Sequence, residues 1–94
     1  MPHLAVRHQV QDYAAWKTVF DELAPQRRAA GEISYQIYHM DGDRNHVVLI
    51  FEWDSTDNCK AFVGSDTLRE AMGKAGVQGE PVIFHLNAGD GGRP

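Results

Sequence analysis

The sequence contains a single cysteine, Cys59, so no internal disulfide can form. A lone thiol is typical of a protein in a reducing compartment. Metal-binding spacings are also missing, because no Cys-x-x-Cys, His-x-x-x-His or Glu-x-x-His pattern occurs. We therefore predict no resident metal, since its ligands would have to be gathered from separate strands.

Positive charge is scarce as well. Nine Lys and Arg residues stand against 13 Asp and Glu residues, which gives a formal charge of −4. A surface that neutralises phosphates needs the opposite balance. The apolar segment before Glu52 and Asp54 also lacks the basic, aromatic character of an RNA-binding strand. Nucleic acid is therefore not an expected partner.

Long apolar runs are the third absence. The longest, Val47 to Phe51, falls far short of the roughly 20 residues that span a bilayer. The start of the chain, Met1 to Leu4, has no basic segment followed by an apolar stretch, as a secretion signal would. We expect a cytoplasmic protein with no membrane partner.

The 94 residues suffice for one domain, which at this size buries only about 60–65 % of the surface exposed by the unfolded chain. Four of the eight residues from Asn87 to Pro94 are Gly or Pro, and none is large and apolar. We predict a domain over residues 1–87 and a flexible, Gly-rich tail over residues 88–94.

Periodicity predicts the order of elements. Leu4 to Val10 alternates like a strand, Asp12 can cap a helix with an apolar stripe as far as Leu23, and Pro25 predicts a break in that helix. Two further strands flank a hairpin loop, two short helices follow, and a last strand closes the chain. Their predicted positions are 33–40 and 46–53 for the strands, starts at Ser55 or Thr56 and at Ser65 or Asp66 for the helices, and 82–86 for the last strand.

This order is βαββαβ, the α+β arrangement of a ferredoxin-like fold, with a four-stranded antiparallel sheet and all helices on one face. Val47, Leu49 and alternate residues point to one side of the third strand, and Val48 and Ile50 point to the other. Four strands about 4.8 Å apart and some 20 Å long give an uncovered face of roughly 400 Å². We predict a homodimeric α+β barrel in which a second copy covers this face and a cavity lies between the subunits.

Three segments show a family resemblance: Val10-Gln-Asp-Tyr-Ala-Ala-Trp-Lys17, Phe51-Glu-Trp-Asp-Ser55 and Ser65-Asp-Thr-Leu-Arg-Glu-Ala-Met72. Together with the order of elements, they resemble the antibiotic-biosynthesis-monooxygenase superfamily of dimeric α+β barrels over about residues 3 to 87. The superfamily also includes heme-degrading enzymes, lactone isomerases and dye-peroxidase-like relatives. The resemblance therefore implies the fold more directly than it implies one reaction.

The resemblance also implies positions around a pocket. Trp53 stands where the monooxygenase branch has a pocket-lining tryptophan. Met72 stands where the heme-degrading branch has its essential histidine, and Phe62 where more typical members have one. The departure at Met72 counts against heme degradation, and Phe62 and Met72 can still line a substrate pocket. Oxygenases of this family use an electron-rich phenolic substrate, with no metal, flavin or heme cofactor.

Histidine suits removal of a phenolic proton because its ordinary pKa is near 6.5. We take His39 and His8 as candidate catalytic residues and His85 as a candidate ligand contact. Arg7 can hold an anionic substrate, and Tyr35 joins Trp53 as an aromatic surface for a planar ring. A histidine on a strand is more often a structural hydrogen-bonding group than a catalyst, and Cys59 is interpreted as a core side chain.

The alternation of side chains does not decide which side of the sheet faces the cavity. Placing Trp53 in a cavity away from the helices turns Glu52 toward them, where an unpaired carboxylate is costly unless a bulge intervenes. Two functions are weighed: a cofactor-independent monooxygenase acting on a small aromatic or polyketide-like compound, and a non-catalytic or isomerase-type dimer that binds a small apolar ligand. The sequence identifies neither the substrate nor a higher oligomeric state.

Overall fold

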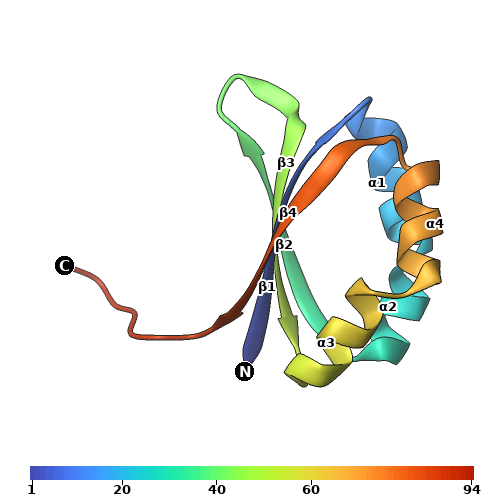
Figure 1. Ribbon diagram of the computed structural model, residues 1–94. Coiled ribbons are helices and arrows are strands. Elements are labelled where there is room, and N and C mark those ends of the chain that lie inside the picture. The colour runs from blue at the N-terminus through green and yellow to red at the C-terminus, as the bar shows by residue number, and fades with distance from the viewer.

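The computed structural model describes all 94 residues as a sheet with helices on one side only (Figure 1). Four antiparallel strands lie in the order β2-β3-β1-β4. The ferredoxin-like α+β prediction is confirmed. The elements are β1 (Pro2–Val10), α1 (Tyr13–Glu22), α2 (Ala24–Ala30), β2 (Glu32–Met40), β3 (Asp43–Trp53), α3 (Thr56–Val63), α4 (Asp66–Lys74) and β4 (Val77–Asn87).

Short polar side chains begin three of the helices. Asp12 accepts from the Ala15 amide at 3.0 Å, Ser55 from the Asn58 amide at 3.1 Å and Ser65 from the Leu68 amide at 3.2 Å. The predicted break at Pro25 is also present. Leu23 ends α1, and Pro25 lies in the first turn of α2, where its missing N–H leaves no hydrogen bond unmade.

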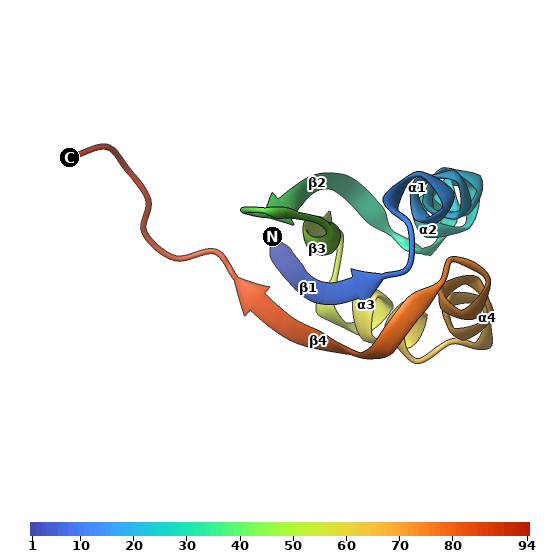
Figure 2. The ribbon, with the colours of Figure 1, turned by 90° about the horizontal axis from the view of Figure 1, so that it is seen from above.

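Two strands are longer than predicted. β3 begins at Asp43, so the expected loop contracts to a turn around Asp41 and Gly42. β4 begins at Val77, because its first residues pair with the end of β1 beyond an irregularity between Arg7 and Gln9. Residues 88–94 have no regular secondary structure and extend away from the domain (Figure 2).

The face of the sheet that the helices cover carries the core. Leu4 of β1 lies opposite Phe51 of β3, and Val6 lies opposite Leu49, so their side chains share that face. Trp16 and Phe20 of α1 pack onto it. The buried core comprises Leu4, Val10, Trp16, Phe20, Val47, Leu49, Phe51, Trp53, Cys59 and Ala75.

The opposite side of the sheet, which we call the open face, carries the side chains of alternate parity. Glu52 lies there with a third of its side chain exposed, and its Oε2 is 3.7 Å from Nε2 of His3. Glu52 is therefore not an unpaired carboxylate beneath the helices, because Trp53 is the residue that faces them. Large apolar side chains on the open face remain exposed, namely Tyr38, Val82, Phe84 and Leu86.

None of the helices is long and apolar enough to cross a membrane.

Candidate functional site

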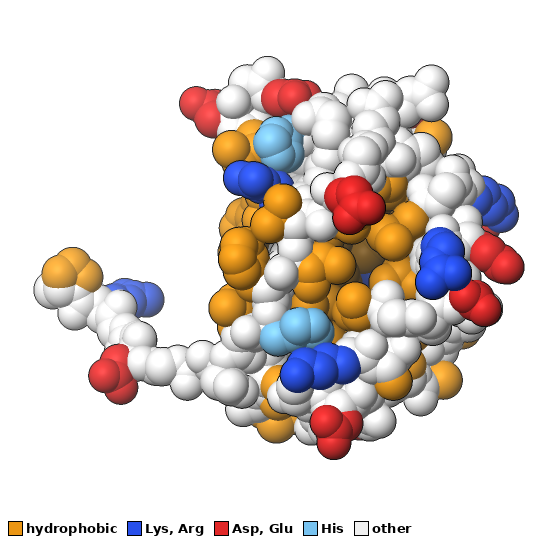
Figure 3. All heavy atoms as spheres, viewed as in Figure 1, with side chains coloured by type: hydrophobic (Ala, Val, Ile, Leu, Met, Phe, Trp, Pro, Cys, Tyr) orange, Lys and Arg blue, Asp and Glu red, His pale blue; other side chains and the backbone are white.

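A largely apolar cavity lies between the sheet and the helices of a single chain. Fifteen of its 19 lining residues are hydrophobic, and Figure 3 shows hydrophobic side chains around a hollow there. The cavity has a volume of about 90 Å³, which is room for several waters or a small ring. This cavity lies on the helix-covered side of the sheet, within one chain, whereas the sequence analysis expected a cavity between two subunits; that second cavity stays a prediction.

His8 lies at one end of the cavity. Its position on β1, opposite Val47, puts the ring on the helix-covered face beside the edge of Trp16, with ring centroids 5.7 Å apart. Only 7 % of the residue is exposed, and neither ring nitrogen has a hydrogen-bond partner. Burial, together with the nearby His46, lowers the pKa of His8 to about 4. The imidazole is therefore neutral at pH 7, with one nitrogen able to accept a proton.

Trp53 lies at the other end, six residues further along β3 than Val47, or roughly 20 Å between the two Cα atoms. Its side chain is buried beside Phe62 of α3, with ring centroids 5.6 Å apart, and its indole N–H has no acceptor. Phe62 and Met72 both line the cavity. These three side chains form a mainly apolar part of the wall, in which the indole N–H of Trp53 is a free donor.

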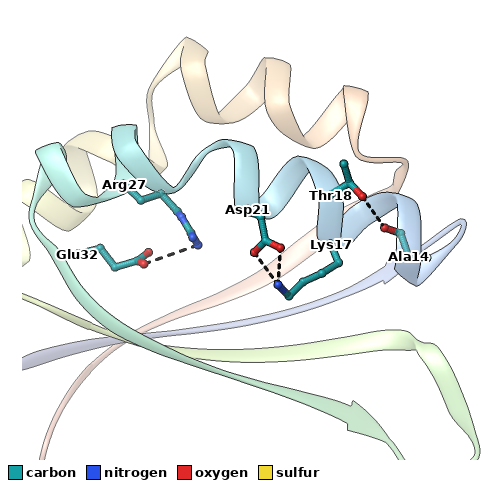
Figure 4. A network of polar contacts seen from close by, with 6 residues as sticks. All are labelled: Ala14, Lys17, Thr18, Asp21, Arg27 and Glu32. Carbon is teal, nitrogen blue, oxygen red and sulfur yellow. Dashed lines mark hydrogen bonds and ion pairs between the residues drawn. The ribbon is translucent and has the colours of Figure 1, made fainter.

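An ion pair that the sequence analysis missed also lines the Trp53 end. Arg27 of α2 and Glu32 at the start of β2 are both buried, and Nη1 of Arg27 lies 3.6 Å from Oε2 of Glu32. Figure 4 shows the two side chains directed toward each other in the space between helix and sheet. The guanidinium also stacks on Phe20, with its Cζ 3.6 Å from the ring centroid.

Burial shifts the pKa of both partners against their charged forms. It lowers the pKa of Arg27, opposed by the charge of Glu32, and it raises the pKa of Glu32, opposed by the charge of Arg27. Arginine nevertheless remains protonated in proteins. Each charge is thus held in this apolar setting by its partner.

The turn between these two residues depends on Gly31. Its φ of 124° is unfavourable for any other residue, and a Cβ there would collide with the Asp54 carboxylate. The Gly31 carbonyl accepts from the Asp54 amide at 2.9 Å, which ties the turn to the end of β3. This turn sets where Arg27 and Glu32 stand relative to each other.

All the buried side-chain nitrogen and oxygen atoms that lack a hydrogen-bond partner belong to residues that line the cavity. There are six such atoms, and they belong to His8, Arg27, Glu32 and Trp53. Buried polar groups are normally paired, because an unpaired group loses its hydration without compensation. Their concentration around one hollow indicates a place built to receive hydrogen-bonding groups of a ligand.

Four predicted site residues lie outside the cavity. His39 is exposed, with Nδ1 2.7 Å from the Arg44 carbonyl oxygen and its ring edge-on to Tyr13. Arg7 projects from the open face, and Tyr35 is 43 % exposed on the edge strand β2. The structure thus brings His8, Trp53, Phe62 and Met72 together around the cavity and leaves His39, Arg7, Tyr35 and His85 outside it.

His85 lines a separate, polar groove beside the end of β4, where its Nδ1 lies 3.9 Å from Sγ of Cys59. The spacing of Cys59 and His85 along the chain does not indicate that they are neighbours. Burial raises the pKa of the Cys59 thiol, and the negative charge of Glu32 adds to the rise. Cys59 therefore behaves as a core thiol, as predicted. No group of three or more His, Cys, Asp or Glu side chains is arranged to hold a metal ion.

Comparison with known proteins agrees with this architecture. The family model for antibiotic biosynthesis monooxygenases matches residues 7–74, which is more than half of the chain. The chain belongs to the antibiotic biosynthesis monooxygenase family. Among curated proteins, no sequence matches it closely enough to count as a relative.

Solved structures show the same fold at low sequence identity. A proposed antibiotic biosynthesis monooxygenase from Caulobacter crescentus CB15 is 24% identical, with a TM-score of 0.73 over 95% of this chain and 90% of its own. One from Bordetella bronchiseptica is 16% identical, with a TM-score of 0.77 over 93% and 95%. SnoaB, a cofactor-independent oxygenase from Streptomyces nogalater, is also 16% identical, with a TM-score of 0.71 over 94% of each chain.

Proposed function

We propose that this protein is a cofactor-independent oxygenase that acts on a small aromatic or polyketide-like compound bound in the cavity. The observation that carries the proposal is His8, a buried neutral imidazole with both nitrogens unpartnered at the wall of an apolar hollow. SnoaB, which shares the fold, is a cofactor-independent oxygenase.

The reaction begins with a proton transfer. The phenolic hydroxyl of the substrate gives its proton to the free nitrogen of His8, which leaves an electron-rich phenolate in an apolar environment. Because burial disfavours the imidazolium form of His8, transfer is easiest from an acidic phenol, such as one conjugated with a carbonyl group. The same burial keeps His8 unprotonated at any pH well above 4, and it also makes His8 a weaker base than a solvated histidine.

Dioxygen is the oxidant and the phenolate supplies the electrons. A bond forms between one oxygen atom and the ring carbon para to the phenolate, and His8 returns its proton to the peroxide. The O–O bond then breaks as water leaves with the hydrogen of that ring carbon. Phenol and dioxygen thus become quinone and water, with one of the two dioxygen atoms in each product. The protein's contribution is to orient the ring, hold the proton and exclude bulk water.

Oxygen uptake by the purified, chelator-treated protein tests the proposal. With a panel of single-ring phenols and naphthols that carry a hydrogen para to the hydroxyl group, we expect one dioxygen consumed per quinone formed. His8→Gln should lower the rate by about 10²- to 10⁴-fold, the usual contribution of a proton-transfer group. His3→Gln is the matched control, because His3 lies on the open face. Absence of uptake across the panel contradicts the proposal and favours a non-catalytic ligand-binding protein; so does full activity of His8→Gln.

We further propose that the open face pairs with that of a second copy of the chain. Phe84 is 57 % exposed there and lies next to other apolar side chains, so solvent would otherwise cover a large apolar surface. Sedimentation at micromolar concentration should show a dimer, and Phe84→Asp should weaken it about a hundredfold or more by burying an unpaired charge. A well-folded monomer of the unaltered chain overturns this assignment.

A further inference from the structure

The Arg27–Glu32 pair has the charges of a salt bridge but lacks its hydrogen bonds. The 3.6 Å between Nη1 and Oε2 exceeds the 2.7–3.2 Å usual for an N–H···O bond. No hydrogen-bond partner is present for Nε and Nη1 of Arg27 or for Oε1 of Glu32. Only 5 % of the Arg27 side chain and 8 % of the Glu32 side chain are exposed. Arg27 and Glu32, whose side chains line the cavity, therefore hold donors and an acceptor with their hydrogen-bonding capacity unused.

The two charged side chains that line the cavity, Arg27 and Glu32, already balance each other. Arg27 is compensated by Glu32, and the neighbouring Asp21 is held by Lys17, whose Nζ lies 2.6 Å from both carboxylate oxygens (Figure 4). A bound anion would leave one uncompensated negative charge beside Glu32, and a bound cation one positive charge beside Arg27. Either is costly in a cavity with mostly hydrophobic walls. The pair therefore favours a ligand group with no net charge.

An uncharged group satisfies both partners when it carries an acceptor next to a donor. Its carbonyl oxygen accepts from the guanidinium of Arg27, and its adjacent N–H or O–H donates to Oε1 of Glu32. Trp53 lies opposite Glu32 in the pairing of β2 with β3. Its indole N–H has no hydrogen-bond partner and offers a further donor at the same end. Phe62 and Met72 supply apolar surface for the attached ring.

We propose that Arg27 and Glu32 form a recognition subsite for the uncharged donor–acceptor edge of a planar ligand, such as a carboxamide or a hydroxyl group beside a carbonyl. This inference deepens the proposed function, because it rests on the same cavity and names the class of compound that the cavity takes. It concerns binding alone and requires no turnover.

Nuclear magnetic resonance titration of the full chain tests the subsite with three ligands of nearly equal shape. Benzamide carries an acceptor and a donor, acetophenone carries only the acceptor, and benzoate is an anion. The indole N–H signal of Trp53, distinguished from that of Trp16 with a Trp53→Phe variant, reports binding at this end. We expect benzamide to bind about tenfold or more tightly than either of the other two.

Glu32→Gln makes the test sharper, because it keeps the shape of the side chain and removes one charge. The subsite then carries the positive charge of Arg27 alone, so the ratio of benzoate to benzamide affinity should rise by about tenfold or more. Glu52→Gln is the matched control, since Glu52 lies on the open face of the same sheet. It should leave the ranking of the three ligands unchanged.

A ranking in which benzoate or acetophenone equals or exceeds benzamide in the unaltered protein overturns the proposal, as does an unchanged ranking in a folded Glu32→Gln variant. If that variant does not fold, the ranking in the unaltered protein decides. The two proposals fail separately. If the protein prefers benzamide but takes up no oxygen, only the proposed oxygenase activity is contradicted. If it takes up oxygen but does not prefer benzamide, only the proposed subsite is contradicted.

Discussion

The two faces of the sheet invert the usual distribution of polar and apolar groups. On the helix-covered face, His8, Arg27, Glu32 and Trp53 hold polar atoms that are buried and unpaired. On the open face, apolar side chains such as Phe84 are exposed to solvent. Each arrangement lowers the stability of an isolated chain, and each suits a different partner. The first suits a small ligand with hydrogen-bonding groups, and the second suits another protein surface.

The largest difference in stability between the faces should appear when one phenylalanine from each face is replaced by alanine. Phe51 faces the helices and is 8 % exposed, whereas Phe84 on the open face is 57 % exposed. Phe51→Ala should lower the free energy of unfolding by about 3–5 kcal/mol, because it leaves a void in the core. In dilute solution Phe84→Ala should change it far less. Urea denaturation of both variants at several protein concentrations measures the contrast.

The contrast breaks if Phe84→Ala destabilises the chain as much as Phe51→Ala and by the same amount at every protein concentration. That result would mean that some part of the same chain covers the open face. A concentration-dependent effect of Phe84→Ala instead supports pairing between copies.

The next effect is a dependence of stability on pH that arises on the helix-covered face. The pKa of His8 falls from its ordinary 6.5 to about 4 in the folded protein, so between these values the unfolded chain binds more protons. Stability is full above pH 6.5, falls as the pH drops toward 4 and then levels off. The pKa difference corresponds to about 3 kcal/mol of lost stability. Urea denaturation from pH 7 to 4 measures this loss.

His8→Gln should remove this part of the pH dependence, since glutamine does not titrate. Other groups of the chain also titrate in this range, so the informative quantity is the difference between the two curves. Parallel curves for the variant and the unaltered protein would show that His8 is hydrated in the folded state, and the contrast between the faces would weaken accordingly.

The smallest effect concerns the exposed ion pair next to the buried one. Lys17 and Asp21 are one helical turn apart on α1, and their hydrogen bond raises the pKa of Lys17. Lys17→Met should lower the free energy of unfolding by about 0.5 kcal/mol or less, as is usual for an exposed pair four residues apart. Measurement in low and high salt should show this small effect shrinking with salt. A loss of 2 kcal/mol or more, outside the roughly 0–1 kcal/mol of exposed pairs, would mean that the pair supports the charge balance around Arg27.

The sequence was sufficient to predict the order of elements, because caps, breaks and alternation are local. Asp12, Ser55 and Pro25 act within one helical turn of their own position. Alternation also put His8 on the same side of its strand as Leu4 and Val6. It did not say on which side of the sheet the cavity lies, because that depends on how closely the helices approach the sheet.

The Arg27–Glu32 pair was not predictable in the same way. An arginine in a short polar helical segment and a glutamate at the start of a strand are typical surface residues, and each becomes buried only when α2 folds against the sheet. His39 failed as a cavity residue for the opposite reason. Its alternation is suitable, but it lies on the edge strand, where its ring meets Tyr13 and the hairpin instead.

Gly31 controls the geometry of the Arg27 end of the cavity from a position outside it. The residue lines no part of the hollow, yet the distance between a positive and a negative group inside depends on the bend that it alone tolerates. Arg27 and Glu32 flank this bend, so a substitution at either position leaves the bend in place, whereas a side chain at Gly31 would move both of them. The chemistry of this end can therefore be altered at the flanks of the turn only while its centre stays fixed.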